Sequence, residues 1–494
     1  TGVQTCALPI FRIAALWSMG AQYLSFIIQF AVSVLISRFF LTPAEVGLFS
    51  IALAAAQLLA VLQEFGLTRY ISGTADLGRD ELRTCASVAL LFAWGVAAII
   101  ALLAAPIAHF YDDARLMPLM LIVAASYLFV PFSVIPSALL SKAMNFRALF
   151  FVNAGSTAIN AALALSLAAA GWSAAALAWA MIGQAAARAV IAQIMRPAPL
   201  PFPLRLTGAM PIVRFGSAAS ALYVSGAIGT RTPDLIVGKL ITLHAVGLFS
   251  RATALAGQIV TLVSGAIGAV FYPAFARLRD AGEPLAPAYY RVVASYTALI
   301  WATMAGLALG AEPLVRAVYG EKWIEVAPLL SWIAISEFLF VMLPLHVDIP
   351  MLLGRTGTLI RLNLLDTGAA LAFLAFASAH GVEAAAQSRI AYGAAWVLVY
   401  ARFLHTLIGF EWRVMFKIYA SSAAAALAAV IPMLLAYRFW VGPEAMAFWQ
   451  LAVVSAAGGL CWLGALALLR HPSWSEIMAI ATPLLARLGK PRPA

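Results

Sequence analysis

Residues 85–110 read CASVALLFAWGVAAIIALLAAPIAHF, a run of 26 residues without an Asp, Glu, Lys or Arg. A helix needs about 20 mostly apolar residues to cross a bilayer. Similar runs recur along the 494 residues, which are 64% hydrophobic and 10% charged, with a mean hydropathy of +0.96. A soluble domain is roughly half apolar and about a quarter charged. The sequence therefore predicts an all-α polytopic membrane protein and excludes a soluble enzyme, a disordered chain and a secreted disulfide scaffold.

We expect about fourteen transmembrane helices. Charged residues, Gly and Pro separate fourteen apolar runs, near residues 15–38, 46–70, 85–110, 116–141, 148–170, 173–195, 210–232, 244–270, 289–311, 326–351, 357–379, 384–408, 416–438 and 447–469. The gaps between these runs are too short to fold as separate domains. The bilayer is therefore the main environment of this chain.

The cations are distributed unequally between alternate gaps. Twenty Lys and Arg fall on the side of the N-terminus, seven on the opposite side and four inside the runs. Cytoplasmic loops carry an excess of Lys and Arg, so we expect both termini in the cytoplasm. Membrane topology also explains the formal charge of +11, and no nucleic-acid partner is expected.

Residues 35–50 recur at residues 235–250 with eight identities in sixteen positions, among them Thr42 with Thr242 and Gly47 with Gly247. An offset of 200 residues corresponds to six helices of about 33 residues each, so both copies enter the membrane in the same direction. Parallel repeats are an architecture of transporters; an inert duplicated scaffold is the alternative. We therefore expect a non-native segment at 1–10, an N-lobe at 11–195, a Pro-rich linker at 196–208, a C-lobe at 209–408, two extra helices within 409–470 and a cytoplasmic tail at 471–494.

Eight segments, spread over residues 41–323, resemble the oligosaccharide flippases of the polysaccharide transporter family, within the multidrug/oligosaccharidyl-lipid/polysaccharide superfamily. They are LTPAEVGL (41–48), EFGL (64–67), APIAHFY (105–111), MNFR (144–147), DLIVG (234–238), VGLFSRA (246–252), FYPAFARL (271–278) and YGEKW (319–323).

The resemblance implies two lobes in a V around a central cavity, in the inner membrane of a bacterium. It implies transfer of undecaprenyl-pyrophosphate-linked oligosaccharide, for O-antigen or exopolysaccharide, from the cytoplasmic to the periplasmic leaflet. Alternating access coupled to an ion or to the membrane potential would drive this transfer, beside polymerase and export machinery. No cofactor is implied.

A pyrophosphate cargo requires cations, and charges inside spans usually face a cavity or a partner. Arg251 is the main candidate, because its counterpart in the other copy of the repeat is Ile51. A turn at Gly247 is expected to aim Arg251 at the cleft between the lobes; the alternative is an arginine that snorkels to the interface. The further candidates for substrate binding are Arg231, Lys239, Arg38 and Arg214. The alternatives are a local ion-pair cluster with Asp234 for Arg231 and Lys239, an interfacial anchor for Arg38 and a topology marker for Arg214.

Carboxylates in or near the spans could carry a proton or hold Na⁺. The candidates for this ion coupling are Glu64, Asp234, Glu337 and Asp348; pairing with a nearby Arg is the alternative. Arg188 and Arg389 lie in the last helix of each repeat, where hydrogen bonding between helices is the favoured interpretation. Three cysteines without metal-ligand spacing predict no metal site.

Several alternative functions stay open. A glycan polymerase or ligase would need a sizeable periplasmic loop, and the gaps on that side are short. A multidrug exporter or a lipid II flippase of the same superfamily is closer in kind, and fourteen spans with the YGEKW segment favour polysaccharide over drugs. A scramblase without an energised cycle is a further alternative. The sequence predicts a transporter rather than an enzyme.

Overall fold

The structure is a computed structural model that describes residues 17, 20, 22–60, 67–74, 77–476 and 478, apart from the side chains at 69, 72–73, 214–225, 263–270 and 272–273. The chain divides into two compact units, Thr1–Gly247 and Leu248–Ala494. The division falls inside one long helix, α10, and each unit is described by itself below.

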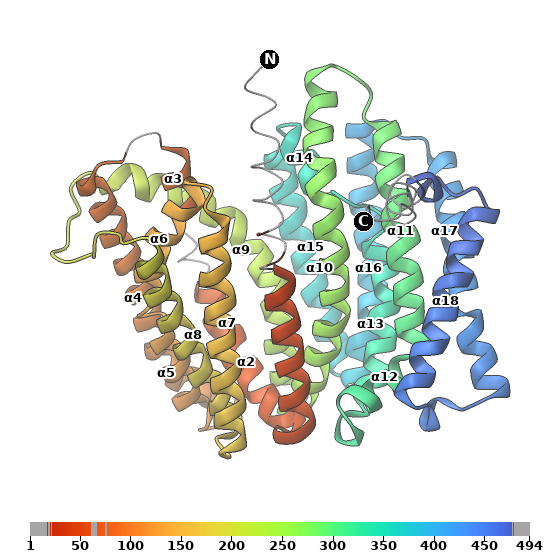
Figure 1. Cartoon of the computed structure of the whole chain (residues 1–494), viewed down its shortest axis with the longest axis horizontal. Coiled ribbons are helices and arrows are strands. Elements are labelled where there is room, and N and C mark those ends of the chain that lie inside the picture. The colour runs from red at the N-terminus through yellow and green to blue at the C-terminus, as the bar shows by residue number, and fades with distance from the viewer. Residues whose placement is uncertain are drawn as a thin grey trace, which may run out of the picture. The chain divides into compact units, whose positions relative to one another are not determined.

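The first unit consists of helices that run side by side (Figure 1). The helical segment Gln22–Phe40 comes first and ends in a π-helix, η1 (Ile36–Phe40). The others are α2 (Pro43–Ala60), α3 (Leu67–Gly73), α4 (Arg79–Phe110), α5 (Leu116–Ser126), α6 (Val130–Lys142), α7 (Phe146–Ala169), α8 (Ser173–Met195), α9 (Ala209–Leu240) and the start of α10 (Leu243–Asp280).

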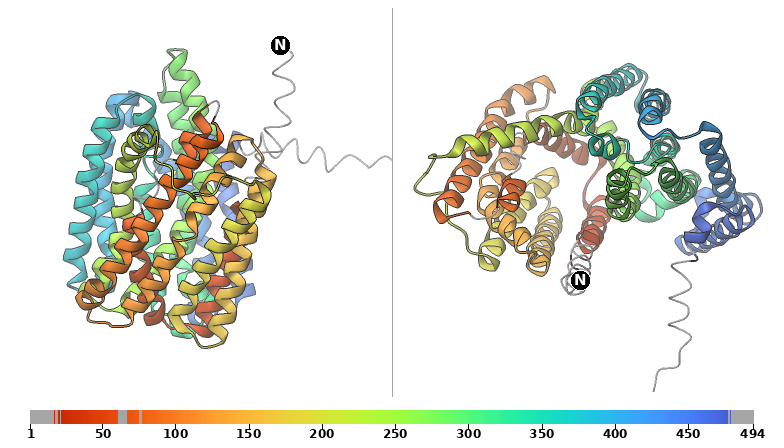
Figure 2. Two further views of the ribbon diagram at one scale, coloured as in Figure 1. Left: turned by 90° about the vertical axis from the view of Figure 1, so that its left-hand side faces the viewer. Right: turned by 90° about the horizontal axis from the view of Figure 1, so that it is seen from above.

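The second unit is also built of helices, and Figure 2 shows its last two long helices, α17 and α18, next to each other in blue. After α10 it contains α11 (Ala286–Leu309), α12 (Ala311–Val318), the 3₁₀ turn η3 (Glu321–Trp323), α13 (Val326–Phe340), α14 (Asp348–Leu352), α15 (Thr356–Ser378), α16 (Val382–Ile408), α17 (Trp412–Phe439), the 3₁₀ turn η4 (Pro443–Ala445) and α18 (Phe448–Leu468).

The predicted fold class is confirmed. The described part of the chain contains no strand, and twelve of its helices are long and apolar enough to cross a membrane. Two further predicted spans, 210–232 and 326–351, correspond to α9 and to the shorter apolar helix α13. The count of fourteen and the repeat stay predictions, as do the lobe boundaries.

Two predicted spans are interrupted, each for a local reason. The span at 116–141 is α5 followed by α6, because Pro131 has no amide hydrogen to donate to the carbonyl four residues earlier. Residues 127–130 bond instead to carbonyls three residues earlier, which tightens the chain into a 3₁₀-like turn. The span at 326–351 ends as a helix at Phe340. Pro344 follows, and Leu345 has φ +57°. Proline lacks the amide that a helix needs, and a left-handed residue ends helical geometry.

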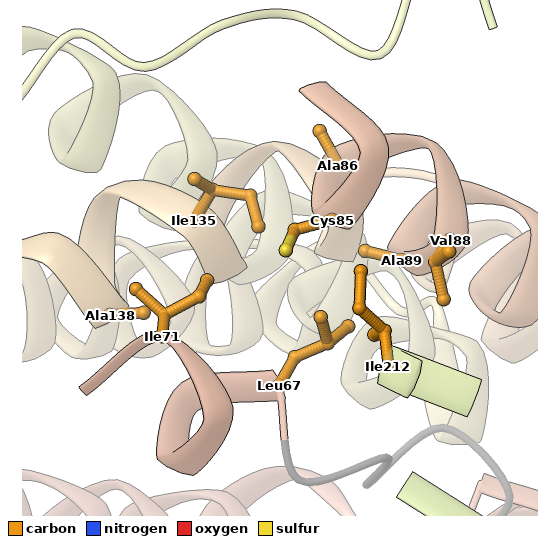
Figure 3. Close-up of a cluster of buried hydrophobic side chains, with 9 residues drawn as sticks. All are labelled: Leu67, Ile71, Cys85, Ala86, Val88, Ala89, Ile135, Ala138 and Ile212. Carbon is orange, nitrogen blue, oxygen red and sulfur yellow. The ribbon is translucent and has the colours of Figure 1, made fainter. Parts of the chain in front are cut away.

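Alanines and larger aliphatic side chains together fill a core cluster of the first unit. Figure 3 shows nine buried residues from α3, α4, α6 and α9 that converge around Cys85, with Ile71, Ile135 and Ile212 between alanines. Lipid is as apolar as leucine, so helices in a bilayer associate through close packing rather than through the hydrophobic effect. The alanines allow that close packing.

Gly47 and Gly247 lie at a close crossing of α2 with the start of α10, within the first unit. A Cβ built on Gly47 would lie 1.8 Å from the carbonyl oxygen of Leu243, and one on Gly247 would lie 1.9 Å from that of Pro43. Leu243 follows Pro43 by the same 200 residues that separate the glycines, so the two contacts are reciprocal. Two copies of one motif that meet about a two-fold axis would make this contact, which supports the predicted repeat.

Candidate functional site

Arg251 packs against an aromatic pair of its own unit. Its guanidinium carbon lies 5.8 Å from the centre of the Trp323 ring. Trp323 is fully buried and packs on Tyr319, with 6.0 Å between ring centres. Gly320, at φ +85°, turns the chain between them. The YGEKW segment therefore forms a compact turn beside Arg251, and the aromatic face attracts the cation. The expected turn at Gly247 is wrong, since Gly247 is helical within α10.

Lys239, at the end of α9, contacts the end of α4 and the turn that follows it. Its ammonium donates to the Phe110 carbonyl, lies 4.6 Å from the Phe110 ring centre and is 3.6 Å from Asp112 Oδ2. The Tyr111 hydroxyl donates to the Leu235 carbonyl over 2.8 Å. Burial raises the pKa of Tyr111 to about 12, so this hydroxyl keeps its proton. No sequence pattern links Lys239 to Asp112, which lies 127 residues away.

The other predicted binding residues have varied surroundings. Arg231 is exposed and Asp234 half-buried, and no ion pair among the described residues joins Asp234 to Arg231 or Lys239. Arg231 acts on the Asp234 carboxylate through space and not through a contact within 4 Å, and the ion-pair cluster around Asp234 stays a prediction. Arg38 is exposed in η1, with its guanidinium carbon 5.9 Å from the Phe39 ring centre; π-helical turns recur at functional sites. Arg214 lies in α9, but its side chain and the whole of Glu64 are outside the described residues.

Glu337 of α13 is buried and forms an ion pair with the partly buried Arg389 of α16. Arg389 Nη2 lies 2.7 Å from Glu337 Oε1, and Arg389 Nε donates to Ser336 Oγ over 3.2 Å. One turn further along α16, Tyr392 donates to Asp366 of α15 over 3.0 Å. The predicted hydrogen bonding of Arg389 between helices is present. The pairing favours a structural ion pair at Glu337 over a proton carrier, whereas Asp348 is exposed at the start of α14.

Replacement of Arg389 by methionine is expected to destabilise the protein by about 3–5 kcal/mol, because it leaves the Glu337 carboxylate buried without a partner. The double variant Arg389→Met, Glu337→Leu removes both charges and is expected to recover most of this loss. Thermal unfolding followed by tryptophan fluorescence measures the effect. Additive losses in the double variant would contradict a direct pair.

A polar cavity of about 530 Å³ lies in the first unit, among the segment Gln22–Phe40, α7 and α8. Its lining combines Gln and Asn side chains with phenylalanine rings, and its one charged residue is Arg188. The volume falls within the range of about 300–1,000 Å³ typical of small-molecule sites. The position of Arg188 in the last helix of the first predicted repeat favours hydrogen bonding between helices. The described residues offer its guanidinium no hydrogen-bond or ion-pair partner.

An apolar cavity of about 340 Å³ lies in the second unit, between α11, α17 and α18. Its lining has no charged residue and includes four glycines, Gly306, Gly310, Gly458 and Gly459, beside Met433 and Trp462. A Cβ on Gly306 or Gly459 would meet no atom within 4 Å, so these two glycines leave open space. Gly458 instead allows close packing of α17 and α18, since a Cβ there would lie 2.4 Å from the carbonyl oxygen of Ala429. Among the described residues, no group of three or more His, Cys, Asp or Glu could hold a metal ion.

Curated proteins of similar sequence are named for polysaccharide pathways. The chain is 25% identical over 353 residues to the succinoglycan biosynthesis transport protein ExoT of Rhizobium meliloti, with 68% of each chain covered. It is 22% identical to the lipopolysaccharide biosynthesis protein WzxC of Escherichia coli, over 60% of each chain. It is 23% identical to the teichuronic acid biosynthesis protein TuaB of Bacillus subtilis, over 53% of this chain and 54% of that protein. The matches thus span between about half and two thirds of these relatives.

Among solved structures, the chain is similar to the lipid II flippase MurJ in an inward closed conformation, with a TM-score of 0.72 over 92% of this chain and 98% of that one. The sequence identity is 13%, so this similarity concerns the fold. The model of a polysaccharide biosynthesis protein family matches residues 35–328, more than half of the sequence, and this confirms the resemblance found in the sequence. The chain is a multi-pass membrane protein that belongs to this polysaccharide biosynthesis protein family.

Proposed function

We propose that this protein is a transporter that moves undecaprenyl-pyrophosphate-linked oligosaccharide, a repeat unit of O-antigen or exopolysaccharide, from the cytoplasmic to the periplasmic leaflet by alternating access. The observation that carries the proposal is the family match over residues 35–328 in a chain with the fold of a lipid II flippase. The relatives named for succinoglycan, lipopolysaccharide and teichuronic acid pathways support a glycan cargo.

The chemistry of such a cargo has counterparts in the two units. Its glycan is rich in hydroxyl groups, which suit the amide-lined cavity of the first unit. Its carrier lipid is apolar, which suits the uncharged cavity between α17 and α18. Its pyrophosphate needs cations, for which we propose Arg251 with Arg38, Arg231, Lys239 and Arg214 as supporting candidates. Ion coupling would involve Asp234, Asp348 or Glu64, whereas Glu337 would take part only if its ion pair with Arg389 opened.

A lipid II flippase is the second candidate, because the fold similarity is to a protein with that activity. Expression in a host depleted of its own lipid II flippase separates the two. Rescue of growth would favour lipid II as cargo, and failure to rescue, with the protein present in the membrane, would favour an oligosaccharide of a surface polymer.

Chromosomal deletion tests the proposal in the bacterium that encodes the protein. We expect the deletion strain to lose one surface polysaccharide and to accumulate the lipid-linked repeat unit of that polymer on the cytoplasmic face. Restoration by the gene in trans is the control. An unchanged set of surface glycans would contradict the proposal.

We propose further that the protein lies in the inner membrane with both termini in the cytoplasm, and cysteine labelling tests this orientation. In a variant without Cys6, Cys85 and Cys461, Arg115→Cys should react with a membrane-impermeant maleimide in spheroplasts, and Asp80→Cys only after permeabilisation. Both side chains are 67% exposed, so access should depend on the side of the membrane. Labelling in the reverse order would overturn the orientation.

A further inference from the structure

Three helical segments each present a polar stripe to the 530 Å³ cavity of the first unit. Asn153 and Thr157 of α7 are four residues apart, as are Gln184 and Arg188 of α8. Residues four apart share a helix face. Gln22, Ser25 and Gln29 form a corresponding stripe at spacings of three and four on the segment Gln22–Phe40. Polar residues inside membrane spans cost free energy and usually have a function. Three such stripes that converge on one cavity therefore indicate a binding site.

Several polar side chains of this cavity have no hydrogen-bond partner among the described residues. The Ser25 hydroxyl is buried and has no hydrogen-bond partner among the described residues. The side-chain amides of Asn153 and Gln184 likewise bond to no described residue. An amide offers both donors and an acceptor, and a sugar hydroxyl needs both. The cavity therefore has the hydrogen-bonding capacity that a carbohydrate requires.

Arg188 gives the lining a net positive charge. Its side chain is exposed to the cavity, and the lining contains no carboxylate. The arginine of the second unit in the corresponding last helix, Arg389, is paired with Glu337 at 2.7 Å. An unpaired guanidinium in a membrane segment is costly, and it binds carboxylates in a bidentate manner. The charge at Arg188 is thus available for an anion from outside the protein.

The depth of the cavity favours a sugar over a phospholipid headgroup. Thr157 lies eleven residues after the start of α7, about 16 Å along the helix axis at 1.5 Å per residue. Arg188 lies seven residues before the end of α8, about 10 Å from it. The predicted topology places these two helix ends on the cytoplasmic side. The cavity then extends from that interface into the hydrocarbon layer, deeper than headgroups lie.

We propose that this cavity binds a sugar residue that carries a carboxylate, with Arg188 on the carboxylate and Asn153 and Gln184 on the hydroxyls. The proposal rests on the proposed function, since the sugar would belong to the transported oligosaccharide, and it names the cargo class as acidic glycans loaded from the cytoplasmic side.

Binding to the purified full-length protein in nanodiscs tests the proposal. The probes are a trisaccharide of glucuronic acid and a glucose trisaccharide, in phosphatidylcholine discs. We expect the uronate to bind at least tenfold more tightly, and Arg188→Gln to remove this difference. Arg188→Lys should retain part of it. Asn153→Ala with Gln184→Ala should weaken both probes. The matched control is Arg196→Gln, which removes the same charge from the end of the same helix, outside the cavity.

Equal affinity of the wild-type protein for both probes would overturn the proposal, and so would an Arg188→Gln variant that is folded by thermal unfolding and binds uronate unchanged. Loss of uronate binding when the discs contain phosphatidylglycerol in place of phosphatidylcholine would assign the cavity to a lipid headgroup. This result would also overturn the proposal. A separate flipping assay with lipid-linked oligosaccharides distinguishes a failure of the proposed transport function from a failure of the proposed sugar site. Wild-type protein that binds uronate but flips no lipid-linked sugar contradicts only the transport function. The opposite case is one in which the wild-type protein and Arg188→Gln both flip neutral and acidic cargo equally well. That result contradicts only the acidic-sugar site.

Discussion

Replacement of Gly47 by alanine is expected to abolish accumulation of the folded protein, and replacement of Gly247 should do the same. A Cβ at either position would lie within 2 Å of a backbone carbonyl oxygen, of Leu243 or Pro43 respectively. A backbone atom cannot move aside as a flexible side chain can, so α2 and the start of α10 would have to separate. We expect a loss above about 4 kcal/mol, in the range reached by severe overpacking. Fluorescence-detected size exclusion of the solubilised protein measures it.

Gly257→Ala is the matched control, since Gly257 lies in the same helix as Gly247 with no atom within 4 Å of the added methyl group. Alanine is favoured over glycine in a helix by about 1 kcal/mol, so this variant should be as stable as the wild type or more so. Normal levels and stability of Gly47→Ala would show that the two helices do not cross as closely as described.

Replacement of Arg251 by alanine is expected to abolish surface glycan while the protein remains in the membrane. Charge-assisted hydrogen bonds contribute about 1.5–3 kcal/mol each, so one lost contact to a pyrophosphate should lower transport about tenfold or more. Arg251→Lys keeps the charge but not the bidentate geometry, and should retain partial export. Immunodetection of surface polysaccharide, normalised to protein in the membrane, measures both variants.

Arg277→Ala provides the control for Arg251, because Arg277 is exposed in the last turn of the same helix. Its loss should leave export near the wild-type level. Because Arg251 also packs against Trp323, thermal unfolding must accompany the export assay. A stable Arg251→Ala variant with full export would remove Arg251 from the proposed mechanism. An unstable one would assign it to the support of the YGEKW turn.

Most of the fold was accessible from hydropathy, because a lipid environment leaves long apolar helices as the main solution for this chain. Interruptions were less accessible. A proline stands near each interruption, Pro131 at the start of α6 and Pro344 after α13. Pro106 lies inside the uninterrupted helix α4, so a proline in the sequence does not by itself show where a helix stops. Gly47 and Gly247 were visible as repeat partners, but their backbone contact required the structure.

The candidate site was less predictable, since charge alone does not specify a partner. Arg188 and Arg389 are both arginines in the last helix of a predicted repeat. One faces a polar cavity and the other pairs with Glu337. Lys239, predicted as a binding residue, contacts Asp112 across 127 residues of sequence. Tertiary contacts decide these roles, and the stripes that line the polar cavity could have been found only by comparing faces of three separate helices.

Reconstitution of the purified protein into liposomes tests the transport function most directly. Undecaprenyl-pyrophosphate-linked oligosaccharide is placed in the inner leaflet, and a glycosidase added outside cleaves only glycans that have crossed. We expect cleavage beyond the amount in protein-free liposomes, and a return to that background with Arg251→Ala. Cleavage by the wild-type protein no greater than in protein-free liposomes, under an imposed ion gradient and membrane potential, would contradict the proposed transport function.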